Sequence, residues 1–289
     1  MRIFKKIYVE ITNACNLNCS FCGGSKKQAG FMYAGVFEGI LVKLKGRTSH
    51  LCLHVMGEPL MHPEICAMLD LCEKHSFKVN LATNGTMTAK LREVMRKPAL
   101  RQISFSLHSL ENSADSKELE KFTGPIFDIA DEAARAGVLI SLRLWNLSKK
   151  QEDRNFDVLE LIKKRYTGGK PIDGNEKRVN GIRLAENIFL NQAERFEWPS
   201  MDSPDIKGAA FCLGLRYQAA VLVDGTVVPC CLDADGVMGL GNIKEKTFAE
   251  IINGKRAKKI YDGFSAKKAV EPLCVKCGYR TRFKRKAEL

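Results

Sequence analysis

The chain has 289 residues, of which 45% are hydrophobic, and a formal net charge of +13 at pH 7. This length and apolar content are enough for a substantial core, which excludes an intrinsically disordered protein. No apolar run reaches the roughly 20 residues that span a bilayer, and the N-terminus runs into a strand without the apolar core of a signal peptide. We therefore expect a cytoplasmic protein with no membrane partner.

The first predicted strand, residues 7–11, is followed at once by three closely spaced cysteines, Cys15, Cys19 and Cys22, in a CxxxCxxC pattern. Soft thiolate ligands select iron-sulfur clusters or zinc over hard cations. Three thiolates on a cube of four irons leave one iron open. A zinc site needs a fourth ligand close by, and no cysteine follows until Cys52.

This loop after a first strand resembles the signature of radical S-adenosylmethionine (radical SAM) enzymes. The resemblance implies a 4Fe-4S cluster whose open iron chelates SAM and whose electron cleaves it to a 5'-deoxyadenosyl radical. It also implies that Phe21, just before the third cysteine, packs near the adenine. An electron donor such as flavodoxin or ferredoxin would reduce the cluster.

Alternating strand and helix patterns continue along the chain and predict an α/β fold with a parallel sheet and helices outside it. The expected strands are residues 7–11, 50–56, 77–83, 101–107, 138–144 and 179–185, and the expected helices are 33–45, 63–75, 88–96, 125–136 and 153–165. Six strands predict an incomplete barrel, and the resemblance implies the same partial (β/α)6 TIM barrel.

Polar residues concentrate on one face of these strands, because side chains alternate between faces along a strand. Ser104 and Ser106 share one parity, whereas Phe105 and Leu107 share the other. The polar parity predicts a barrel interior that receives a polar cofactor and substrate.

Five residues at or near strand ends resemble the cofactor contacts of radical SAM enzymes. Gly57-Glu58 after the second strand resembles the GGE motif that holds the amino group of SAM, with Met56 in place of its first glycine. The resemblance further implies that Asn84 packs against the cofactor, that Ser106 contacts its ribose or carboxylate, and that Arg143 pairs with the methionyl carboxylate. These assignments are expectations carried over position by position.

Candidates for substrate contact or proton transfer are the polar residues of the predicted barrel mouth and the C-terminal third. We predict this role for His108, Arg183 and Asp233, with His54 and Glu186 as further candidates. A histidine beside a polar interior can also serve only as a hydrogen-bonded lining residue.

The C-terminal third, from residue 206 onward, is predicted to form a second domain after a barrel domain of residues 1–205. A β-hairpin is expected over residues 217–223 and 226–228, turning at Asp224-Gly225. Its cysteines, Cys212 and Cys230, are followed by the pair Cys274 and Cys277.

This CX12GX4C hairpin with a following CxxC resembles the Twitch domain, the shortened form of the SPASM domain, with cysteine spacing similar to that of 2-deoxy-scyllo-inosamine dehydrogenase. The resemblance implies a second, auxiliary 4Fe-4S cluster bound by all four thiolates. Two alternatives stay open: a zinc site with four cysteine ligands, and ligation by Cys231 in place of Cys230. Cys52, Cys66 and Cys72 lie in strand and helix patterns and are expected to be core thiols.

The expected substrate is a small polar molecule. The specific hypotheses are a queuine-type modified nucleobase, split at a carbon-nitrogen bond, and an aminocyclitol or sugar alcohol, oxidised to a ketone. A peptide-modifying maturase is a third. The non-enzyme alternative is a metal-stabilised protein that binds RNA through the basic tail Arg280 to Lys286. Because the remaining positive charge is spread along the chain, we expect a solvated basic surface and no nucleic acid partner.

Overall fold

The computed structural model describes residues 2–110, 116–147, 155–172, 177–178 and 181–283. Its strands are β1 (Lys6–Val9), β2 (His50–Cys52), β3 (Lys78–Thr83), β4 (Leu100–Ser106), β5 (Leu139–Leu147), β6 (Lys177–Arg178), β7 (Gly181–Ala185), β8 (Ile188–Glu194), β9 (Gln218–Val221), β10 (Thr226–Val228) and β11 (Gly241–Asn242). Its α-helices are α1 (Ala34–Leu44), α2 (Ile65–Lys74), α3 (Thr88–Val94), α4 (Ser116–Arg135), α5 (Asn155–Tyr166), α6 (Phe248–Asn253), α7 (Lys255–Ser265) and α8 (Pro272–Val275). Short 3₁₀ helices cover η1 (Pro59–Met61), η2 (Leu107–Leu110) and η4 (Gly278–Phe283).

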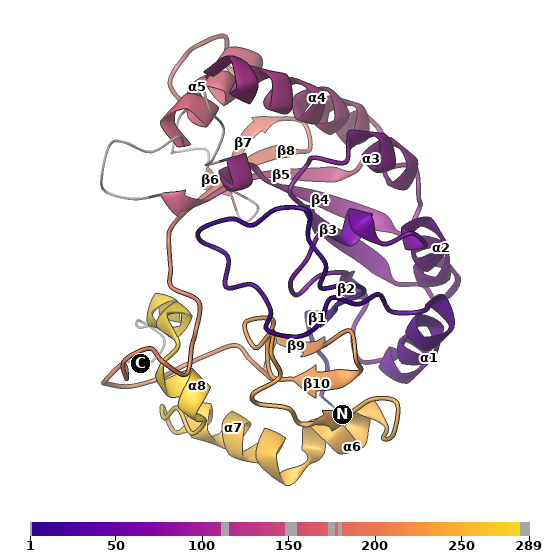
Figure 1. The fold of residues 1–289 in the computed structure, drawn as a ribbon, viewed down its shortest axis with the longest axis vertical. Helices are drawn as coiled ribbons and strands as arrows, with labels where there is room; N and C mark the ends of the chain where they lie inside the picture. Colours follow the sequence, from indigo (N-terminus) through magenta and orange to yellow (C-terminus); the bar gives the residue numbers. More distant parts are fainter. Residues whose placement is uncertain (1, 111–115, 148–154, 173–176, 179–180, 284–289) are drawn as a thin grey trace.

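A single curved sheet runs through the molecule in the order β11-β10-β9-β1-β2-β3-β4-β5-β8-β7-β6. The strands β1 to β5 and β8 are parallel neighbours, and β9 pairs parallel to β1 on the other side. Helices α1 to α5 lie along the outer side of this curve, and the segment after β1 crosses its inner side (Figure 1). The predicted partial barrel is confirmed.

The prediction for the sixth barrel strand was wrong. The residues expected to form it lie in β7, which pairs antiparallel with β8, while β8 takes the sixth parallel position next to β5. Residues 179–180 of the expected strand, and 153–154 of the expected fifth helix, lie outside the described residues. The sequence of β7 has the apolar pattern of a barrel strand because β7 continues the same sheet beyond β8.

Helix α4 also begins earlier than expected, at Ser116, with Pro125 inside it. Proline removes one backbone donor, so an apolar stripe that packs well can carry a helix across it. Leu119, Ile126 and Ile129 of α4 are fully buried.

The two faces of the strands differ as predicted. Register aligns Ala82, Ser104 and Ser141 in one row across β3, β4 and β5, and Thr83, Phe105 and Leu142 in the next. Phe105 and Leu142 belong to the buried core under the helices. The polar row therefore faces the inside of the curve.

The predicted hairpin is confirmed as β9 and β10, which pair antiparallel. Gly225 turns it with a φ of +90°, a conformation that glycine adopts without penalty. Among the described helices, none is both long and apolar enough to cross a membrane.

Candidate functional site

The first candidate site is the loop after β1, which carries Cys15, Cys19 and Cys22. Cys15 and Cys22 are exposed, and Cys19 is half-buried. The loop folds back on itself, because Thr12 bridges to Phe31 and the Cys22 amide donates to Cys19 O at 3.1 Å. Burial raises the pKa of Cys15, and its thiol and that of Cys22 are near enough to interact electrostatically. This donor set of three neighbouring thiols fits three corners of a 4Fe-4S cluster.

Gly57 brings the turn after β2 directly against this loop. Its φ is +75°, and a Cβ there would lie 2.6 Å from Ala14 O and 2.8 Å from Thr12 O. The next amide, that of Glu58, donates to Ala14 O at 2.8 Å. A side chain at position 57 would push the two segments apart.

Glu58 joins the turn to the end of β3. Its carboxylate is buried, with Oε1 accepting from the Leu60 amide at 3.1 Å and Oε2 from the Asn84 amide at 2.7 Å. Burial raises the pKa of Glu58, and these backbone donors oppose that shift. Asn84 in turn donates from Nδ2 to Asn16 Oδ1 at 2.8 Å and is hydrogen-bonded to the Cys15 thiol. The structure therefore brings Cys15, Glu58 and Asn84 together.

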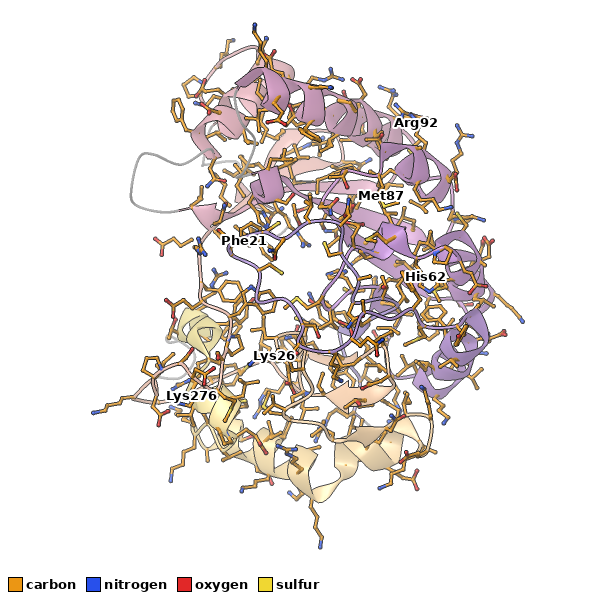
Figure 2. All side chains as sticks on the ribbon, viewed as in Figure 1. Phe21, Lys26, His62, Met87, Arg92 and Lys276 are labelled. Atoms are coloured by element: carbon orange, nitrogen blue, oxygen red, sulfur yellow. The ribbon has the colours of Figure 1, made fainter. Side chains whose placement is uncertain are left out.

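Phe21 lies on the inner side of the sheet (Figure 2), where its ring centroid is 4.7 Å from that of His108. His108 Nδ1 is 3.0 Å from Arg143 O and 3.4 Å from the Trp145 amide nitrogen. Ser106, which is half-buried, pairs with Arg143 in the β4–β5 register. These predicted residues thus form a second group beside the first loop.

Arg183 and Asp233 lie on other segments, on β7 and in the turn after β10. Arg183 is exposed on β7, in the register row of Phe189 and Ser141, and its Nε donates to Ala185 O at 3.4 Å. Asp233 is buried in a turn after β10, with both oxygens accepting from the backbone amides of Val237 and Met238 at 2.8 Å. These bonds favour a structural role for Asp233 over the predicted proton transfer.

Sequence reasoning missed the role of Glu10. Its side chain is 1% exposed, with Oε1 accepting from the Met56 amide and Oε2 from the Val223 amide, both at 3.1 Å. Burial raises the pKa of Glu10 to about 7. One carboxyl group thus holds β1, the turn after β2 and the C-terminal hairpin together. An acidic residue at the end of an apolar strand was the available signal.

The second candidate site is a cavity lined by Cys212, Cys230, Cys274 and Cys277, together with Met238 and Tyr279 among others. Burial raises the pKa of Cys212 to about 11, and it raises those of the other three thiols as well. Four convergent thiols around one cavity fit a fully ligated 4Fe-4S cluster. In the described residues, no three His, Cys, Asp or Glu side chains surround a single-ion position.

Cys231 points away from this cavity. It packs against the inner-face cluster of Tyr8 and Cys52, and its thiol is hydrogen-bonded to the Tyr8 hydroxyl. This placement favours Cys230 as the ligand. Cys52 belongs to the same inner-face cluster, whereas Cys72 lies in the core under the helices.

Comparison with known proteins identifies two matching families. The family described as "Radical SAM superfamily" matches residues 9–167, and the SPASM family, described as "Iron-sulfur cluster-binding domain", matches residues 212–278. The second match begins at Cys212 and ends just after Cys277.

Among the relatives, a "Probable GTP 3',8-cyclase" of Aeropyrum pernix is 23% identical over 79% of this chain and 74% of its own length. A "Tungsten-containing aldehyde ferredoxin oxidoreductase cofactor-modifying protein" of Pyrococcus furiosus is 28% identical over 96% of this chain and 88% of its own. Among solved structures, BtrN in complex with AdoMet and 2-DOIA superposes with a TM-score of 0.62 at 18% identity, covering 96% of this chain and 94% of BtrN. This likeness concerns the fold.

Proposed function

Because the chain belongs to the radical SAM superfamily, we propose that it is a radical SAM enzyme that oxidises a small polar substrate. The proposal rests on two observations. The loop that carries Cys15, the turn that carries Glu58 and the end of β3 at Asn84 meet at one place. Four further cysteines line a separate cavity. When bound, the two 4Fe-4S clusters and SAM supply one-electron chemistry that ends in hydrogen abstraction from the substrate.

Each residue would have a separate role in binding the cluster and SAM, according to its position. Cys15, Cys19 and Cys22 would hold the first cluster and leave one iron for SAM. Each Glu58 oxygen accepts one backbone amide and keeps a second lone pair, which would accept a charge-assisted hydrogen bond from the SAM ammonium. Phe21 would face the adenine and Ser106 the ribose. Their grouping on the inner side of the sheet supports these assignments.

The second cluster would be held by Cys212, Cys230, Cys274 and Cys277. Four thiolates leave no iron open to a substrate, so this site suits electron transfer. An electron-accepting site in the same chain supports a dehydrogenase outcome, as for an aminocyclitol or sugar alcohol. A reductant such as flavodoxin or ferredoxin would serve the first cluster.

A second candidate is a lyase that splits a carbon-nitrogen bond in a queuine-type 7-deazaguanine. It is supported by the relatives named as GTP cyclases, whose substrate is a purine nucleotide. The planar groups that would stack on such a ring are the Trp145 indole, which is 38% exposed, and the Arg143 guanidinium, 4.4 Å from its centroid.

The first test is anaerobic reconstitution followed by counts of iron, sulfide and zinc. SAM and dithionite are then added, and 5'-deoxyadenosine is measured. We expect about eight irons per chain, and about four in the variant Cys15→Ala, Cys19→Ala, Cys22→Ala, which should form no 5'-deoxyadenosine. Cys66→Ala, a cysteine outside both sites, is the matched control and should behave as the wild type.

Product analysis then separates the two candidates. A ketone formed from an aminocyclitol indicates dehydrogenation, whereas a released 7-deazaguanine base indicates the lyase. Zinc in place of iron, with no SAM cleavage, would contradict both candidates and favour the metal-stabilised RNA-binding protein. Residues 284–286 of the basic tail on which that alternative depends lie outside the described residues.

A further inference from the structure

The Arg143 side chain lies on the inner face of β5 without an ionic partner. In the part of the chain that the structure describes, its Nε is buried and has no hydrogen-bond partner. Burial lowers the pKa of Arg143, and the groups that act on it electrostatically are Tyr8, Cys52, Cys231 and Tyr279. None of these four groups is a carboxylate, and the guanidinium carbon lies 4.4 Å from the Trp145 ring centroid.

Arginine stays protonated in proteins, so the guanidinium carries its charge into this site. Arg143 is half-buried, and a partly desolvated charge without a counter-ion is destabilising. Glu10, two residues beyond Tyr8 on the same side of β1, has both oxygens bonded to the backbone amides of Met56 and Val223. The fold thus leaves on its inner face a cation that stacks on the Trp145 ring and has no anionic partner among the described residues.

His54 presents a second unsatisfied group to the same region. Its ring packs edge-on against Tyr8 with centroids 5.5 Å apart, and its Nδ1 is buried without a partner among the described residues. Burial, with Arg143 and Lys6 nearby, lowers the pKa of His54 to about 3, so the ring is neutral at pH 7. The charged groups that face His54 are Arg143 from β5 and Lys6 from β1, and both are cations.

Arg143 also lies between the two candidate cluster sites. On one side its carbonyl contacts His108, whose ring packs on Phe21 of the first loop. On the other side, Tyr8 is hydrogen-bonded to Cys231, the neighbour of Cys230. A substrate that reacts at the first site and passes an electron to the second is expected to lie between the two sites, beside Arg143.

We propose that Arg143 binds an anionic group of the substrate, a carboxylate or a phosphate, with His54 Nδ1 as a second hydrogen-bonding group. This inference rests on the proposed radical SAM function and names its substrate class. It replaces the expectation that Arg143 pairs with the methionyl carboxylate of SAM. It favours a phosphorylated or carboxylated substrate over a free base or free aminocyclitol.

The test measures anion binding without turnover, on the oxidised holoenzyme saturated with SAM. The probes are inorganic phosphate, followed by ³¹P line broadening, and trifluoroacetate, followed by ¹⁹F line broadening. We expect saturable broadening of at least one probe, which identifies the group as phosphate or carboxylate. In Arg143→Gln the Kd of that probe should rise about 10- to 100-fold, the loss of one hydrogen-bonded charge contact.

Matched variants keep the test decisive. Arg143→Lys retains the charge and should bind the probe with intermediate affinity. Arg92→Gln, on the outer helix α3 where Arg92 forms an exposed ion pair with Glu132, should leave the Kd unchanged. Because Arg143→Gln removes an unpaired charge, it should melt no lower than the wild type.

Three results would overturn the inference: no broadening of either probe in the wild type, an unchanged Kd in Arg143→Gln, or a probe that binds through Arg143 only when SAM is left out. The last would return Arg143 to the methionyl carboxylate. Failure of the proposed function is seen separately, as a wild type that forms no 5'-deoxyadenosine although the probe still binds through Arg143.

Discussion

Gly57 fixes the distance between the first cysteine loop and the turn that carries Glu58. It is in the left-handed region, and the space where its Cβ would lie is filled by backbone atoms of Thr12, Asn13 and Ala14. Backbone cannot rotate away as a side chain can, so even alanine must displace the loop that holds Cys15. The identity of this one residue is therefore part of the candidate cofactor site.

We predict that Gly57→Ala destabilises the protein by about 2 kcal/mol or more and loses the first cluster while retaining the second. Iron should fall from about eight to about four per chain. Iron counts and the thermal midpoint of the reconstituted protein check this. Gly39→Ala, within α1 and with open space around its Cβ, is the matched control and should stabilise by about 0.5–1 kcal/mol. Full iron in Gly57→Ala would show that the loop tolerates the displacement.

At the scale of elements, the first cysteine loop is tied to the C-terminal segment. Asp235 Oδ1 accepts from the Lys26 amide at 2.8 Å and from Ser25 Oγ at 3.3 Å. Lys27 Nζ forms an ion pair with Asp224 Oδ2 at 2.7 Å. Residues that follow Cys22 by only a few positions are thus positioned by residues some two hundred positions later.

Asp235→Ala should loosen the loop, because both of its bonds are lost at once. We expect a chelator to remove iron from the first cluster roughly fivefold faster, which corresponds to about 1 kcal/mol. The rate for the second cluster should not change. Asp262→Ala, which breaks an exposed ion pair with Lys258 on α7, is the control. Equal rates in Asp235→Ala and wild type would mean that this tie does not hold the loop.

At the scale of the whole molecule, the sheet continues from the barrel into the C-terminal hairpin. Residues Lys6 to Val9 of β1 pair with Gln218 to Val221 of β9, and Glu10 accepts from Val223. Removal of the hairpin would expose β1 as an unpaired strand edge, and such edges promote aggregation. The sheet thus links the two domains that the sequence predicts.

We therefore predict that a chain truncated to residues 1–205 aggregates, as measured by size-exclusion chromatography and light scattering. The full-length variant Cys274→Ala, Cys277→Ala keeps the hairpin and should stay monodisperse with about four irons. A monomeric fragment that retains its first cluster would show that residues 1–205 fold as an independent domain.

The sequence by itself determined what is local. The CxxxCxxC loop, the Gly57-Glu58 turn and the Asp224-Gly225 hairpin each lie within a few residues, so spacing and residue type reveal them. The inner face of the strands could also be predicted, because alternation within one strand needs no knowledge of its neighbours.

Only the tertiary structure decided what depends on strand order. Apolar pattern cannot distinguish β7 from β8, since both lie in the same sheet and only pairing makes one parallel and the other antiparallel. The same holds for Arg143, whose unpaired charge depends on Tyr8, Cys52 and Cys231, all distant in sequence. Whether a charge has a counter-ion depends on its neighbours in space, and the fold determines which residues those neighbours are.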